Sequence, residues 1–307
     1  MDTILVMAAG VAVGRFFPAK YRKQNEWVQL ACTLLLIFSM GLGLGQQPDF
    51  FSDLAALGLS SLLFFLLPTA GSVAAVWLLT RRRGGPAHGR PASAALPAGA
   101  PRPRVGDPMM FFALGAVGLG LVCGAVSPLA AALAPVRDGA QWILYLLMFC
   151  VGITLGNDRT LAGRVRRLDP RLALLPVATA VGTLAGAALA APLLAEWSLT
   201  DSLAVGAGFG YYSLSSIFIA DFRGPELATI ALLCNVMREI FTLLAAPLVA
   251  RWCGPLAAVS IGGATTFDTT LPIITQAAGR PYAVVSVFHG CVLDFSVPFL
   301  VTFFCTV

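Results

Sequence analysis

The stretch GGATTFDTTLP (residues 262–272) places glycine, threonine, aspartate and proline inside an apolar part of the chain. Each glycine costs roughly 1 kcal/mol in a helix relative to alanine, and proline removes a backbone donor, so we expect a broken helix here. A second stretch, GAGFGYYSLSS (residues 206–216), is equally unsuited to a continuous helix. Long apolar runs that begin near Pro225 and Pro281 follow the two stretches. The sequence therefore predicts two units, each a broken segment followed by a long helix.

The composition places these segments in a membrane. Of the 307 residues, 58% are hydrophobic and 11% are charged, whereas soluble domains carry about 25% charged residues. The apolar runs are long and continuous, which favours helices over barrel strands, because the latter alternate over ~10 residues. The net charge of +5 comes from basic clusters between apolar runs, so it indicates membrane topology rather than nucleic-acid binding. Helix breaks at membrane depth are tolerated where they line a cavity, and paired breaks are typical of transporter binding sites.

Ten hydrophobic segments are predicted, most of them near the ~20 residues that a spanning helix needs. They cover residues 3–18, 27–45, 54–80, 109–134, 139–157, 172–195, 201–222, 226–251, 256–278 and 282–306. The loops after the first, third and fifth segments are rich in Lys and Arg. Basic loops favour the cytoplasmic side, so we expect the N-terminus outside, and the C-terminus outside as well.

The first two thirds of the chain contain a repeat. FSMGLGLG (residues 38–45) and FCVGITLG (residues 149–156) are 111 positions apart, and Phe17-Pro18 and Ser127-Pro128 are 110 apart. These matches predict three-helix repeats at residues 1–80 and 109–195, which are inverted relative to each other because each has an odd number of crossings. Between them we expect a flexible, basic cytoplasmic linker at 81–108, and after them a transport core at 196–307.

The expected fold is an all-α polytopic membrane protein with an inverted 3+3 scaffold followed by two hairpin-plus-helix units. If both broken segments are re-entrant hairpins, the chain has eight spans and two hairpins; if both cross, it has ten spans. The first plan has the layout of the sodium-coupled glutamate transporters, which is an analogy of fold alone. The charge rule does not separate the two plans.

Ionisable residues inside the apolar segments are candidates for function, because each costs ~2.5–3.5 kcal/mol at mid-membrane. Glu239 shares a helix face with Asn235, and Arg238 lies in the same sector. An Arg238–Glu239 charge balance is the structural alternative. Asp268 lies among Thr265, Thr266 and Thr269, where a carboxylate, hydroxyls and freed carbonyls would suit a cation, or where the Asp could simply cap a half-helix.

Further polar residues complete the candidate set. Tyr211, Tyr212 and Ser213 occupy the matching place in the first broken segment, where they could bind an amino-acid backbone or serve only as turn residues. His289 and Asp294 form a candidate proton relay on the last helix, although a core histidine with one hydrogen bond is the simpler interpretation.

Two intramembrane carboxylates predict a cationic substrate or cation coupling. Desolvation favours the protonated form of a carboxylate, so a proton could compete with a substrate cation, which is a minimal antiport mechanism. The sequence contains no Walker motif, which argues against direct use of ATP by this chain. The seven cysteines form no CxxC pair and only two histidines are present, so we expect no metal site and no cofactor.

The C-terminal third resembles the bacterial lysine exporter LysO family. GFGYYSLS (residues 208–215) is similar to its GFGWYSLS-type signature, and Asn235 with Arg238 and Glu239 resembles its next helix. GATTFDTTLP (residues 263–272) is similar to its GAT-x-x-D-x-T-L-P loop, and His289-Gly290 with Val297-Pro298 resembles its last helix. The chain departs from the expected pattern at Val236, where an acid is expected, at Asp294, where none is expected, and in its longer linker.

The resemblance implies a bacterial inner-membrane exporter of L-lysine and its toxic analogues rather than an enzyme, with Glu239 and Asp268 as its key acids. Protons are then the expected coupling ions, and the partners are L-lysine or a related small cationic amino acid and the lipid bilayer. A homodimer is compatible with this, although the sequence does not fix the oligomeric state. The competing interpretations are a carrier of another cationic or zwitterionic solute and a cation channel; an intramembrane enzyme is the weakest, since no catalytic motif supports it.

Overall fold

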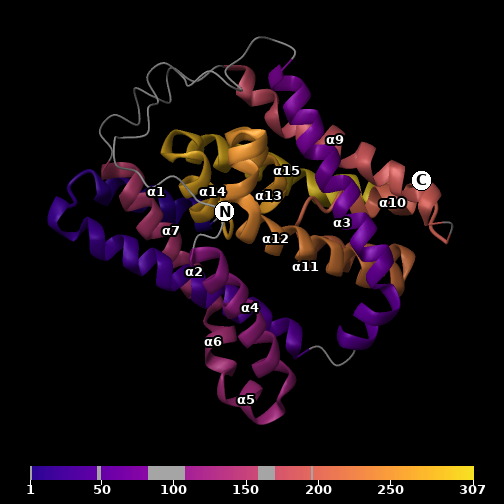
Figure 1. Ribbon diagram of the computed structural model, residues 1–307, viewed down its shortest axis with the longest axis horizontal. Coiled ribbons are helices and arrows are strands. Elements are labelled where there is room, and N and C mark those ends of the chain that lie inside the picture. Colours follow the sequence, from indigo (N-terminus) through magenta and orange to yellow (C-terminus); the bar gives the residue numbers. More distant parts are fainter. Residues whose placement is uncertain (1, 47–49, 82–107, 158–169, 195) are drawn as a thin grey trace. The chain divides into compact units, whose positions relative to one another are not determined.

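The computed structural model describes residues 2–46, 50–81, 108–157, 170–194 and 196–307, and the described elements are helical (Figure 1). The predicted linker at 81–108 lies, apart from its ends, outside the described residues. Helices form two compact units, which are considered separately below. The first comprises residues 1–51 and 106–168, and the second comprises 52–105 and 169–307.

Unit 1 contains four long helices and two short ones. They are α1 (Asp2–Gly14), α2 (Arg22–Gly45), α4 (Pro108–Ala125), α5 (Ser127–Ala132), α6 (Ala134–Asp138) and α7 (Ala140–Asn157). Helix α1 packs on α7, α2 packs on α4, and α2 also contacts α7. Asn25 and Gln29 of α2 donate hydrogen bonds to the Cys150 carbonyl of α7, both at 3.0 Å, so polar contacts fix the α2–α7 pairing inside an apolar unit.

Glycines allow the two main crossings of unit 1. A Cβ on Gly10 would lie 2.3 Å from the Phe149 carbonyl oxygen, and one on Gly152 would lie 2.3 Å from that of Met7. At the α2–α4 crossing, a Cβ on Gly41 would lie 2.4 Å from the Val117 oxygen, and one on Gly120 would lie 2.2 Å from that of Phe38. These helices therefore approach backbone to backbone, which is the packing that small-xxx-small patterns permit in membranes.

Unit 2 contains the remaining elements. They are α3 (Phe50–Arg81, with its first two residues in unit 1), η2 (Pro170–Leu174), α9 (Leu175–Ala190), η3 (Ala191–Leu193), α10 (Leu199–Gly206), α11 (Tyr212–Arg223), α12 (Pro225–Cys253), α13 (Pro255–Gly262), η4 (Gly263–Phe267), α14 (Leu271–Ala278) and α15 (Arg280–Thr306). Helix α12 contacts α11, α13 and α14, and α15 contacts α10, α11, α14 and η4. The two long helices α12 and α15 therefore frame the two broken segments.

Both predicted helix breaks are confirmed. Helix α10 ends at Gly206 and α11 begins at Tyr212, while α13 ends at Gly262 and α14 begins at Leu271. In the first segment, an ion pair of 3.3 Å joins Asp201 in the first turn of α10 to Arg223, the last residue of α11. Arg223 also donates to the Cys305 carbonyl at 3.1 Å, so the end of α15 lies at the same level.

Six of the described helices are long and apolar enough to cross a membrane. They comprise Arg22–Gly45, Ala55–Thr80, Ala140–Asn157, Pro170–Leu193, Pro225–Cys253 and Arg280–Thr306, and shorter apolar helices cover Leu5–Gly14, Gly115–Ala125 and Pro255–Phe267. These findings support a polytopic, helical membrane protein. The expected segment 109–134 is divided in the structure: α4 ends at Ala125, and a new short helix begins at Ser127-Pro128, because proline is favoured in the first turn of a helix.

Candidate functional site

The two helix breaks meet. The Ala264 amide donates a hydrogen bond of 2.9 Å to the Phe209 carbonyl, which joins the tip of one broken segment to the tip of the other. Gly263 has φ +59°, and a Cβ at this position would lie 2.0 Å from the Phe209 oxygen. Only glycine fits both the backbone conformation and the close approach. The two broken segments, more than 50 residues apart in the sequence, therefore meet at their tips.

Helix α12 binds the first tip through Asn235. The Gly210 amide donates to Asn235 Oδ1 at 2.7 Å, and Asn235 Nδ2 donates to the Ala231 carbonyl at 2.8 Å and to Ser215 Oγ at 3.4 Å. The side chain is 4% exposed, so these partners satisfy an amide that would otherwise be costly to bury. Asn235 therefore acts on the shape of the tip, and its amide is already occupied by protein groups.

Helix α12 binds the second tip through Arg238. Its Nε donates to the Ile261 carbonyl at 2.9 Å and its Nη2 donates to the Ser260 carbonyl at 3.1 Å, while both terminal nitrogens lie 3.4 Å from Thr183 Oγ1 of α9. Ile261 and Ser260 belong to the last turn of α13, where carbonyls lack intrahelical donors and carry partial negative charge. The guanidinium thus satisfies the end of α13, and its printed bonds go to the tip rather than to Glu239.

Glu239 and Asp268 are linked by one threonine. Thr269 Oγ1 donates to Glu239 Oε1 at 2.6 Å and lies 3.3 Å from Asp268 Oδ1, which also accepts from the Thr269 amide at 2.6 Å. Glu239 is 4% exposed, and within the described part of the chain its Oε2 is buried without a hydrogen-bond partner. A buried carboxylate oxygen in this state has unused capacity for a donor, either a proton or an ammonium group.

Other predicted residues surround this carboxylate pair. Asp268 lies within electrostatic range of both Glu239 and Asp294, and Tyr212 lies within range of Glu239 and Asp268. Tyr211 lies within range of Asp268 and Asp294. The structure therefore gathers three carboxylates and two phenols around one region, and such a cluster is suited to a cationic ligand. They come from α11 and the residue before it, α12, the turn before α14, and α15.

The remaining predicted residues are turned to other partners. Thr265 Oγ1 donates to the Gly262 carbonyl at 2.9 Å, and Thr266 Oγ1 donates to the Gly263 carbonyl at 2.8 Å, so both hydroxyls stabilise their own tip. Ser213 is exposed, and its carbonyl accepts from Ser216 Oγ at 3.3 Å. Among the described contacts, none joins Ser213 to Glu239 or Asp268.

His289 has a defined hydrogen-bond pattern. It is fully buried, with Nε2 2.9 Å from Thr179 Oγ1 and Nδ1 3.0 Å from Thr266 Oγ1. Thr179 Oγ1 also lies 3.2 Å from Ser260 Oγ of α13, which extends this polar contact. Both ring nitrogens are therefore occupied by threonine hydroxyls. This places His289 as a core side chain that joins α9, η4 and α15, and no described hydrogen bond connects it to Asp294.

Thr179, Thr183 and Ser260 were not singled out in the sequence. Thr179 and Thr183 lie four residues apart and hence on one face of α9, which was the available signal. Their importance depends on His289 and Arg238, which are far away in the sequence. In the described residues no group of three His, Cys, Asp or Glu side chains could hold a metal ion.

Comparisons with known proteins identify a matching family and two relatives. The model of the family described as lysine exporter LysO matches residues 114–305. A protein of Escherichia coli named lysine exporter LysO is 28% identical over 306 residues, covering 98% of both chains. A protein of Haemophilus influenzae, provisionally named as a lysine exporter, is 32% identical over 163 residues, covering 53% of this chain and 82% of that one. No solved structure matches the chain.

Proposed function

Because the chain belongs to the lysine exporter LysO family, a family of transporters and not enzymes, we propose that it exports L-lysine and its analogues across the bacterial inner membrane. The proposed drive is proton antiport through Glu239 and Asp268. The observation that carries this proposal is the buried, unpartnered Oε2 of Glu239 beside the Thr269-linked Asp268. Either a proton or a substrate ammonium would relieve that oxygen, and two mutually exclusive occupants are the minimum that exchange requires.

The polar ligands divide into two classes in this proposal. Glu239, Asp268 and Thr269, with Tyr211 and Tyr212 nearby, face the substrate cation. Asn235, Arg238, Thr265, Thr266 and His289 position the two tips, since their polar atoms already bond to protein groups. A buried arginine next to a cation site would otherwise repel the substrate, and its bonds to the end of α13 offset its charge.

The proposed topology has eight spans and two re-entrant hairpins. The Asp201–Arg223 ion pair supports a hairpin, because it brings the start of α10 beside the end of α11. The Arg223–Cys305 contact supports a second one. Arg223 directly precedes α12, so this contact places the start of α12 near the end of α15. If both helices cross the membrane, the end of α12 and the start of α15 lie together on the opposite side. The segment between them, which contains α13 and α14, then begins and ends on that same side, as a re-entrant hairpin does. We propose the N- and C-termini outside, which puts the basic loops in the cytoplasm.

The proposed inverted 3+3 scaffold is supported by pairs of equivalent glycines. Gly10 of the α1–α7 crossing and Gly120 of the α2–α4 crossing are 110 positions apart, and Gly41 and Gly152 are 111 apart. Within unit 2, Gly71 of α3 and Gly182 of α9 are also 111 apart. A Cβ on Gly71 would lie 2.2 Å from the Gly182 oxygen, and the reverse distance is 2.4 Å. Equivalent residues meet in this way at a two-fold axis.

A carrier of another cationic solute is the second candidate. Asp294 adds a third carboxylate within range of Asp268, which suits a ligand with more positive charge than lysine. A channel is less favoured, since the Ala264–Phe209 hydrogen bond joins the two tips at the site.

Counterflow of radiolabelled lysine in proteoliposomes tests the proposal. Glu239→Gln and Asp268→Asn should each lose exchange, because an amide keeps the shape but not the charge. Glu226→Gln on the exposed first turn of α12 and Asp221→Asn on α11 are the matched controls, and both should exchange like the unmodified protein. Lysine exchange that persists in folded Glu239→Gln would remove the carboxylate mechanism. Absence of lysine exchange in the unmodified protein, together with exchange of another cation, would favour the second candidate.

A further inference from the structure

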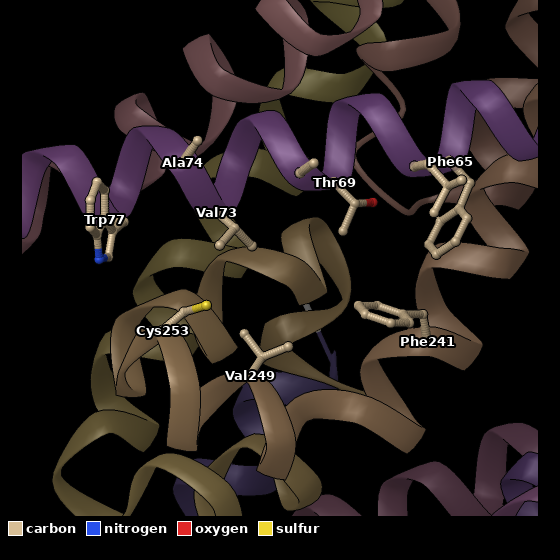
Figure 2. A pocket seen from close by; sticks show the side chains of 10 residues that line it. Phe65, Thr69, Val73, Ala74, Trp77, Phe241, Val249 and Cys253 are labelled. Carbon is tan, nitrogen blue, oxygen red and sulfur yellow. The ribbon is translucent and has the colours of Figure 1, made fainter.

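A cavity of about 460 Å³ lies between α3 and α12 of unit 2 (Figure 2). On α3 its lining residues recur every three or four positions, from Phe65 to Trp77, and therefore form one face of the helix. On α12 the lining includes Phe241, Val249 and Cys253. Val73 of α3 and Val249 of α12 point toward each other across it (Figure 2).

The length of the cavity matches one membrane leaflet. Twelve residues separate Phe65 from Trp77, and twelve separate Phe241 from Cys253, which corresponds to ~18 Å of helix on each wall. The hydrocarbon core of a bilayer is ~30 Å thick, so one leaflet contributes about half of this length. Phe241 lies two residues after Glu239, so the deep end reaches the level of the candidate site.

The two ends of the cavity differ. At the deep end, Phe65 and Phe241 make an edge-to-face contact with ring centroids 5.5 Å apart, which closes the space between the helices. At the other end lies Trp77, near the last residues of α3 and α12. Tryptophan is enriched where membrane helices meet the headgroups, so this end fits the membrane surface.

We propose that this cavity binds one acyl chain of a phospholipid from the leaflet at the C-terminal end of α12. In the proposed orientation that leaflet is cytoplasmic. Apart from Thr69, the walls offer apolar side chains from Trp77 at one end to the Phe65–Phe241 pair at the other. An acyl chain that moves into this space exchanges contacts with other lipid tails for contacts with two protein walls. The favourable free energy of binding therefore comes from close packing rather than from hydrophobic transfer out of water.

Thr69 distinguishes an alkyl chain from a polar ligand. Thr69 lines the cavity and is 5% exposed (Figure 2). Its hydroxyl has no hydrogen-bond partner within the described part of the chain. An acyl chain cannot pair with this hydroxyl, so Thr69→Val should leave binding unchanged or strengthen it. A ligand with a deep acceptor would instead lose its partner in this variant.

The experiment uses the full-length protein in proteoliposomes with a phospholipid that carries a diazirine at the middle of one acyl chain. After photolysis, mass spectrometry of peptides should place the label on residues 65–77 and 241–253 in excess over exposed positions such as Phe299 of α15. Val73→Phe should lower this labelling at least about fivefold, because Val73 points into the space and close-packed walls leave no room for both ring and chain. Leu78→Phe, on the exposed part of α3, is the matched control and should label normally.

Val249→Phe on α12 provides a second filled variant should Val73→Phe fail to fold, and lysine counterflow with size-exclusion profiles monitors folding in each case. Label spread evenly over α3, α12 and α15 would overturn the proposal, as would unchanged groove labelling in a folded filled variant. Loss of labelling in Thr69→Val would also overturn it, because a deep polar group rather than an alkyl chain would then be recognised.

Discussion

Replacement of Gly263 by alanine tests whether the contact between the two tips is needed for transport. The added Cβ would lie 2.0 Å from the Phe209 carbonyl oxygen, whereas real Cβ contacts are essentially never below 3.0 Å. The tips must therefore separate by roughly 1 Å, a displacement that can reduce the activity of a precise site by about 100-fold. This is the expected reduction in lysine counterflow for Gly263→Ala.

The same substitution should lower stability by a calculable amount. Alanine at φ +59° costs on the order of 1–2 kcal/mol. Separation of the tips also breaks the Ala264–Phe209 hydrogen bond and leaves two buried backbone groups unpaired, at about 1–3 kcal/mol. The expected free-energy loss is therefore roughly 2–5 kcal/mol, visible as a lower melting temperature in detergent.

Gly43→Ala and Gly118→Ala are the matched controls, because a Cβ at either position meets nothing within 4 Å. Both should retain counterflow and melt at or slightly above the temperature of the unmodified protein, since alanine favours helix. If Gly263→Ala is folded and exchanges lysine at the normal rate, the tip contact is dispensable and the positioning roles inferred from it fail.

Three more substitutions probe the parts that hold the site together. Arg238→Met should lower the melting temperature, because the Ile261 and Ser260 carbonyls lose their donors at about 1–3 kcal/mol each; an unchanged melting curve would contradict this role. His289→Gln should slow counterflow without changing its pH profile between about pH 5 and 8, because both ring nitrogens contact core threonines and no described hydrogen bond joins the ring to Glu239 or Asp268; a flattened profile would instead identify His289 as a proton carrier. Gly152→Leu should separate α1 from α7 and reduce the folded yield, while Gly115→Leu, with open space around it, should not.

Much of the fold was predictable from the sequence because its signals are local. Apolar length located the long helices, and the glycine-rich stretches at 206–216 and 262–272 located the breaks. The grouping of helices was not predictable in the same way. Helix α3 and helix α9 group with the C-terminal elements in unit 2, although each closes a predicted three-helix repeat. Similarity between two stretches of sequence can predict a repeat, but the grouping of helices depends on which helix faces pack against each other.

The site was only partly predictable, and NVMRE (residues 235–239) on α12 shows why. Helical spacing predicts that Asn235, Arg238 and Glu239 lie in one sector, but it could not assign different partners to them. Asn235 binds the first tip, Arg238 binds the second, and Glu239 alone retains an unpartnered oxygen. Burying a polar group is costly whether the group supports the structure or binds a ligand. Its presence in an apolar helix therefore indicates that it has a role, but not which of the two roles it has. The two roles differ in the number of unused hydrogen-bonding positions. A group whose donors and acceptors are all bonded within the protein positions the site, whereas a group with an unused acceptor is a candidate ligand for the transported cation or a proton. By that criterion α12 carries both tip contacts and the proposed cation ligand within five residues, so any movement of α12 that exchanges the occupant of Glu239 must also act on both tips.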